Sequence, residues 1–132
     1  MIQIAILDNH SLFRLGVQCA FNGASELQVS GEAQYGMELF RILSRKLVNV
    51  VLIGVNRPDD RQCVYTVCRL RKKYPEIKIL ALADENAAEM IPSLTAAGVN
   101  GYIGKRQANR NELLKAVRKI AEGGEYVGRI SG

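Results

Sequence analysis

The stretch Asn49-Val50-Val51-Leu52-Ile53 is a nearly continuous apolar run of strand-forming residues. A strand with one face in water alternates apolar and polar side chains, whereas a strand covered by helices on both faces does not. The run therefore predicts a central strand of a parallel sheet, with helices packed above and below it.

Strand-like runs alternate with helix-period stretches on both sides of this strand. We expect the other strands over 2–7, 27–30, 77–83 and 101–104, and helices over 11–21, 36–45, 62–74 and 109–121, with a further helix ending near Ala97. Such alternation is typical of parallel strands joined by crossover helices. The sequence thus predicts an α/β fold with a single doubly wound five-stranded parallel sheet of flavodoxin-like order 2-1-3-4-5.

Two helices carry more specific predictions. Pro92 lies inside the fourth helical pattern, and proline is tolerated only in the first turn of a helix. We therefore expect that helix to start late, near Glu89, or to kink at Pro92. In the helix over 11–21 the spacing predicts one inward face, formed by Leu12, Gly16, Cys19 and Ala20.

The length of 132 residues fits one domain, which we place at 1–124, with the start of a linker or tail at 125–132. The composition, 48% hydrophobic and 23% charged, is that of an ordinary globular protein. No apolar run is long enough to span a bilayer, and the first residues have no signal-peptide pattern, so we expect a cytoplasmic protein without a membrane partner.

Three cysteines without clustered spacing argue against a disulfide framework, and a single histidine argues against a zinc site. The net charge of +5 is compatible with an acidic partner or a nucleic acid. Because the basic residues are spread over several segments without an aromatic-interleaved patch, we expect a solvated surface and no direct binding of nucleic acid.

In a doubly wound sheet, ligands bind beyond the carboxyl ends of the strands. Those ends supply Asp8-Asn9-His10 after the first strand, Gly54-Val55-Asn56 after the third, Ala83-Asp84 after the fourth and Lys105 after the fifth. Asp84, and Asp60 beyond the third strand, suit turns and helix caps, and His10 suits a helix start.

Three of these segments resemble the receiver domains of NarL/FixJ-type (LuxR-type) two-component response regulators, which have a CheY-like fold. The first runs from Ile6 to Gly16, where the family usually reads Asp-Asp-His-Pro after the strand. The second, 51–58, resembles Leu-x-x-Asp-x-x-Met-Pro, and the third, 98–105, resembles Gly-Ala-x-Gly-Tyr-x-x-Lys. The resemblance covers nearly the whole chain, to about Val127.

The resemblance implies phosphoryl transfer to a carboxylate at the end of the third strand, assisted by Mg²⁺ and a lysine. Three side chains of that chemistry are changed here. Gly54 occupies the position of the nucleophile, Asn9 replaces one of two metal-binding acids, and Ala83 replaces the hydroxyl residue. The resemblance therefore implies a receiver that lacks the phospho-acceptor aspartate.

Four positions keep a group that the family uses. Asp8 is the remaining acid, Lys105 the lysine, Tyr102 the switch aromatic, and Asn56 the residue whose backbone carbonyl would bind the metal. With one acid facing one lysine, we expect no metal, no cofactor and no catalytic residue, and we predict a direct Asp8–Lys105 pair.

The function implied by the resemblance is a phosphorylation-independent regulatory and dimerisation module, not an enzyme. Its partners would be a second copy of the chain and a C-terminal helix-turn-helix DNA-binding domain that is absent from these residues. The basic last helix suits either a self-association surface or a solvated face. The alternatives are a stand-alone receiver-like adaptor, a phospho-relay protein, a flavodoxin-like cofactor binder, and a small-ligand sensor using the vacated pocket.

Overall fold

The apolar run that predicts a central strand forms β3 (Val50–Val55), which lies between β1 (Ile2–Leu7) and β4 (Lys78–Ala83). The computed structural model describes residues 1–130. Almost every β3 side chain is buried, as expected for a strand with helices on both sides.

The sheet has six parallel strands in the order β2-β1-β3-β4-β5-β6, so the prediction of five strands was wrong. The remaining strands are β2 (Leu27–Ala33), β5 (Gly101–Gly104) and β6 (Tyr126–Val127). The added strand begins inside the segment expected to be a linker. Tyr126 is buried, and its hydroxyl donates a hydrogen bond to Glu112, so one aromatic ring reinforces the backbone hydrogen bonds that join this short strand to β5. The last two residues of the expected linker, 131–132, lie outside the described residues.

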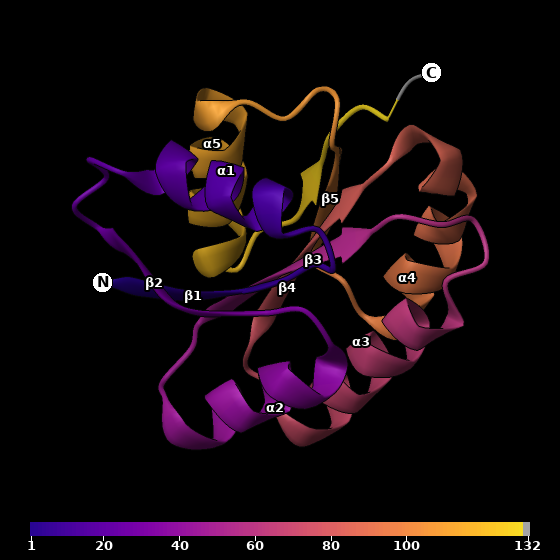
Figure 1. Ribbon diagram of the computed structural model, residues 1–132, viewed down its shortest axis with the longest axis horizontal. Coiled ribbons are helices and arrows are strands. Elements are labelled where there is room, and N and C mark those ends of the chain that lie inside the picture. The colour runs from indigo at the N-terminus through magenta and orange to yellow at the C-terminus, as the bar shows by residue number, and fades with distance from the viewer. Residues whose placement is uncertain (131–132) are drawn as a thin grey trace.

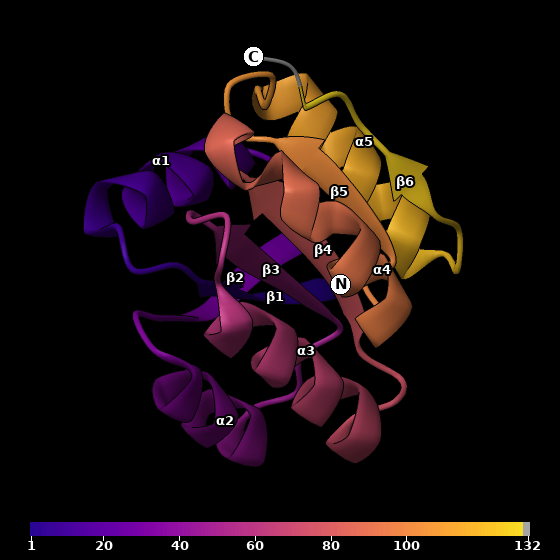
Figure 2. The same cartoon turned by 90° about the vertical axis from the view of Figure 1, so that its right-hand side faces the viewer.

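The helices cover the two faces of the sheet in separate layers (Figures 1 and 2). One layer contains α1 (Ser11–Phe21) and α5 (Arg110–Ala121), and the other contains α2 (Gly36–Arg45), α3 (Arg61–Lys73) and α4 (Ile91–Ala97). Each layer encloses its own apolar core against the sheet. In residues 1–130 no helix has the length and hydropathy needed to cross a membrane.

The two specific helix predictions had different outcomes. Pro92 lies in the first turn of α4, which begins at Ile91 after a 3₁₀ helix, η1 (Glu85–Met90), so the helix does start late. The predicted inward face of α1 was wrong, because Leu12 is exposed whereas Val17 and Phe21 are buried. The apolar residues of α1 are distributed around most of the helix, so their spacing does not identify the buried face. Packing against α5 and the sheet determines which of them are buried.

Candidate functional site

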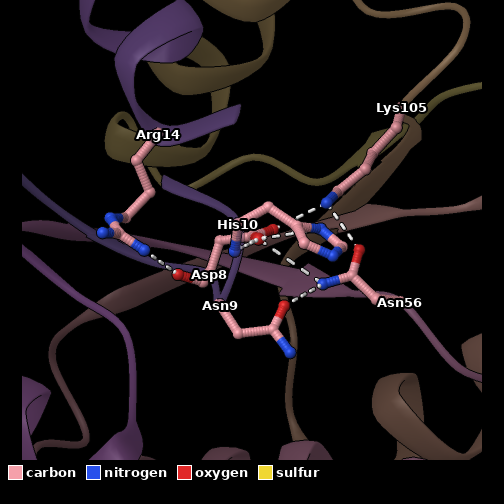
Figure 3. A network of polar contacts seen from close by, with 6 residues as sticks. All are labelled: Asp8, Asn9, His10, Arg14, Asn56 and Lys105. Atoms are coloured by element: carbon pink, nitrogen blue, oxygen red, sulfur yellow. Dashed lines mark hydrogen bonds and ion pairs between the residues drawn. The ribbon is translucent and has the colours of Figure 1, made fainter. Parts of the chain in front are cut away.

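The candidate site lies at the carboxyl ends of the strands and is organised by Asp8, which follows β1 (Figure 3). The Asp8 side chain is 0% exposed. Its Oδ1 accepts a hydrogen bond from the backbone N–H of His10 (2.7 Å), and its Oδ2 accepts one from Lys105 Nζ (2.6 Å). A fully buried carboxylate needs such donors, because an unpaired charge would be strongly disfavoured there.

Lys105 reaches Asp8 from the loop after β5, with a side chain that is 12% exposed. Its ammonium group also donates to Asn56 Oδ1 at 2.6 Å and lies 3.9 Å from the centre of the Phe13 ring. The backbone N–H of Lys105 donates to the carbonyl of Ala83, which ties this loop to the end of β4. The predicted contact between Asp8 and Lys105 is therefore present, as a buried ion pair beside an aromatic face.

Asn56 completes the network through its side chain. Its Nδ2 donates to Asn9 Oδ1 at 2.9 Å and approaches Asp8 Oδ1 at 3.4 Å, while its Oδ1 accepts from Lys105. An amide carries both donors and an acceptor, so this residue can bridge an acid and an amine at once. The sequence pointed only to the backbone carbonyl of Asn56, and the bridging amide was missed.

Gly54 lies directly beside the Asp8 carboxylate. A Cβ atom built on Gly54 would lie 1.7 Å from Asp8 Oδ2 and 2.6 Å from Asp8 Cγ. The carboxylate thus occupies the space in which any side chain at position 54 would begin. A residue other than glycine at this position therefore requires Asp8 to move.

The other predicted residues stand apart from this network. Ala83 is fully buried and offers only its backbone, and Tyr102 is half-buried on β5, packed against the apolar core on the side of α2, α3 and α4. Asp60 and Asp84 cap α3 and η1, as predicted from their positions. Arg14, which sequence reasoning overlooked, donates to the backbone carbonyl of Asp8.

A cavity of about 660 Å³ opens next to Gly54, between the first turns of α2 and α3. Its wall combines the polar ends of the strands with aromatic and basic side chains. The side chains that give the cavity its character are Tyr35, Met37, Phe40, Cys63, Tyr65 and Arg69. Burial, followed by the nearby carboxylates of Asp60 and Asp8, raises the pKa of the Cys63 thiol to about 12, so this side chain is a neutral wall of the cavity.

The residues of this site do not fit the magnesium ion that the resemblance implies. Asp8 is the one acid in the network, it is sealed from solvent, and both of its oxygens already accept hydrogen bonds. Within residues 1–130 no three His, Cys, Asp or Glu side chains are grouped to hold a metal ion. Mg²⁺ is bound through carboxylates and keeps several water ligands, which this closed arrangement does not accommodate.

Comparison with known proteins gives a consistent picture. Residues 4–118 match the family described as "Response regulator receiver domain". The chain is 29% identical over 126 residues to the transcriptional regulatory protein DegU of Brevibacillus brevis, and 25% identical over 126 residues to the oxygen regulatory protein NreC of Staphylococcus epidermidis. Each alignment covers 96% of this chain but only 52% and 57% of those relatives, so the chain spans about half their length.

Solved structures share the fold at low sequence identity. The isolated receiver domain of RcsB from Salmonella enterica superposes with a TM-score of 0.83 at 18% identity, covering 96% of this chain and 92% of that one. A LuxR family DNA-binding response regulator from Silicibacter pomeroyi gives a TM-score of 0.77 at 23% identity, covering 96% of both chains.

Proposed function

Because the chain belongs to the response regulator receiver domain family, we propose that it is a receiver that regulates without being phosphorylated. The observation that carries this proposal is the position of the Asp8 carboxylate. Its Oδ2 lies only 1.7 Å from the point where a Cβ atom of residue 54 would lie. No nucleophilic side chain is available at the position that the family uses, and the neighbouring acid fills the vacated space.

The electrostatics of the pocket support the same proposal. A working receiver pocket holds several carboxylates and needs a divalent ion to balance them. Here one buried carboxylate faces one largely buried ammonium group, and Asn56 makes a polar contact with each of them. Because the two charges already balance each other, the site does not need an ion or a phosphoryl group, and it would keep one conformation.

At the level of the whole protein we propose a transcriptional regulator with a C-terminal DNA-binding domain. The curated relatives are about twice as long as the matched region, and DegU is described as a transcriptional regulatory protein. One similar structure is described as two RcsB dimers bound to two parallel DNAs. By this analogy the domain would act as a regulatory and dimerisation module whose partner is a second copy of the same chain.

Phosphodonor treatment tests the proposal directly. The domain is incubated with acetyl phosphate and Mg²⁺, and its intact mass is then measured. We expect no mass increase, and a Mg²⁺ titration by calorimetry should show no dissociation constant below the millimolar range. A phosphorylated species on the unaltered chain, or tight Mg²⁺ binding, would overturn the proposal. The triple variant Asn9→Asp, Gly54→Asp, Ala83→Thr is the matched comparison, since it restores the family's three missing side chains.

A further inference from the structure

The positive charge of the chain is concentrated in one part of the sequence. Residues 34–73, from the loop before α2 to the end of α3, hold nine Lys and Arg but only three Asp and Glu. The rest of the chain holds nine and ten, respectively. The basic residues do lie in several segments, but α2 and α3 lie on the same side of the sheet and bring part of them together (Figure 2).

The exposed side chains of the two helices form two parallel stripes. Residues three or four positions apart lie on one side of a helix. On α2 this spacing aligns Met37, Arg41 and Arg45, all exposed. On α3 it aligns four exposed residues: Arg61, Tyr65, Arg69 and Lys72. We call these seven residues the α2–α3 face.

The charges of the α2–α3 face have no carboxylate partner within residues 1–130. Across residues 1–130, the Lys and Arg residues that form ion pairs all lie outside the segment 34–73. They are Arg14, Lys105, Arg106 and Arg118. Of the few acids in the segment, Glu38 and Asp60 are engaged by backbone N–H groups at the starts of α2 and α3. The positive field of this face is thus open to an external partner.

An aromatic cluster lies at the centre of the α2–α3 face, beside the cavity. The Arg69 guanidinium group lies 4.3 Å from the centre of the Phe40 ring and 5.8 Å from that of Tyr65, and so joins the two helices. Tyr65 is 59% exposed and Met37 70% exposed, and both line the cavity of about 660 Å³. Arginine, tyrosine and methionine are the residues enriched where proteins bind one another.

We propose that the α2–α3 face docks an acidic segment of a partner protein, with one apolar side chain of that segment inserted into the cavity. The basic residues of both helices would pair with the acidic residues of the segment. The aromatic side chains that line the cavity would contact its apolar side chain. A nucleic acid fits less well, because Arg69 covers Phe40 on one side and Tyr74 stacks near it, with ring centres 6.3 Å apart. The ring is therefore not free as a stacking platform for a base.

Fluorescence anisotropy with defined probes tests this proposal. The probe is a labelled glutamate-rich peptide with one central phenylalanine, compared with the same peptide carrying alanine there and with a thymidine oligonucleotide of equal charge. We expect the phenylalanine peptide to bind best. The variant Arg41→Gln/Arg69→Gln should weaken its binding about tenfold, whereas Lys115→Gln/Lys119→Gln, which removes the same charge from exposed positions of α5, should change it less than about twofold.

A second variant separates the cavity from the charge. Tyr65→Ala leaves the net charge unchanged, so it should weaken the phenylalanine peptide but not the alanine peptide. Equal losses in the Arg41→Gln/Arg69→Gln and Lys115→Gln/Lys119→Gln variants would overturn the proposal, since binding would then follow net charge alone. Equal or tighter binding of the oligonucleotide, or no peptide binding at low salt, would overturn it as well. None of these outcomes depends on whether the receiver can be phosphorylated.

Discussion

The two halves of the candidate site differ in their side chains. At the ends of β1 and β5, Asp8 and Lys105 form a largely buried ion pair of 2.6 Å. At the ends of β3 and β4, Gly54 and Ala83 provide no polar side chain at all. In the charged half the two groups bind each other, and in the other half Gly54 lies beside the cavity.

This difference separates a half whose two charged groups depend on each other from a half in which Gly54 and Ala83 carry no charge. Desolvating two charges costs free energy that their mutual attraction only partly returns, so a buried pair contributes little net stability. Each charged group is nevertheless tolerated in the interior only while the other is present. Asn56 adds to this dependence because its side-chain amide contacts both groups. Breaking the pair should therefore cost far more than forming it gained.

The largest effect is expected from Lys105→Met, which breaks the charged half. Asp8 would be left buried without its counter-ion, and the free energy of unfolding should fall by roughly 3–5 kcal/mol. Urea denaturation followed by circular dichroism measures this change. The double variant Asp8→Asn/Lys105→Met removes both charges, so it should recover much of the loss. A double variant as unstable as the single one would show that packing of the lysine stem, rather than the charge, is what matters.

A smaller loss is expected from Gly54→Asp, which adds a carboxylate to the half formed by Gly54 and Ala83. The new Cβ would displace Asp8 from its present position and bring a second carboxylate next to it. We expect destabilisation of about 1–3 kcal/mol, as for other overpacked sites. Gly16→Asp is the matched control, because a Cβ at Gly16 meets nothing within 4 Å. If both variants were equally stable, the crowding at Gly54 would be relieved at no cost.

Much of the fold could be predicted from the sequence, because burial on both faces leaves a readable pattern. The apolar run of β3 and the position of Pro92 in α4 are examples, and both are local. β6 was missed because a two-residue strand has no periodicity, and it is held by backbone pairing with β5 and by one buried ring, Tyr126. The inward face of α1 was also missed, because that helix carries apolar residues nearly all around.

The part of the candidate site that could be predicted is the part whose residues directly follow a strand. Parallel strands bring Asp8 and Lys105 to one edge of the sheet, so their opposite charges predicted the pair. The bridging amide of Asn56 depends on a side-chain rotamer, which sequence spacing does not reveal. The basic face was missed for a different reason: it is formed by two separate helices, and the packing of α2 and α3 on one side of the sheet places their exposed residues together.

The smallest effect concerns Cys63, which lines the cavity beside Gly54. It tests whether water reaches the Cys63 thiol. Its pKa is raised from an ordinary value of 9.0 to about 12, mainly by burial, so the folded state favours the protonated thiol. That contribution is fully present below pH 9 and is lost as the pH rises toward 12. By pH 10 the free energy of unfolding should fall by about 1 kcal/mol, measured by urea denaturation at pH 7 and pH 10.

Tyr126 contributes to the same measurement. Burial also raises the pKa of Tyr126 to about 12, so it adds a loss of the same sign, mostly above pH 10. Cys63→Ala keeps that background and removes the thiol, so it should lose less stability over this interval than the unaltered chain. Cys68→Ala, which removes an exposed thiol, should not. If Cys63→Ala retained the full pH dependence, water would have to reach the thiol, and the cavity beside Gly54 would extend deeper into the core than its present wall.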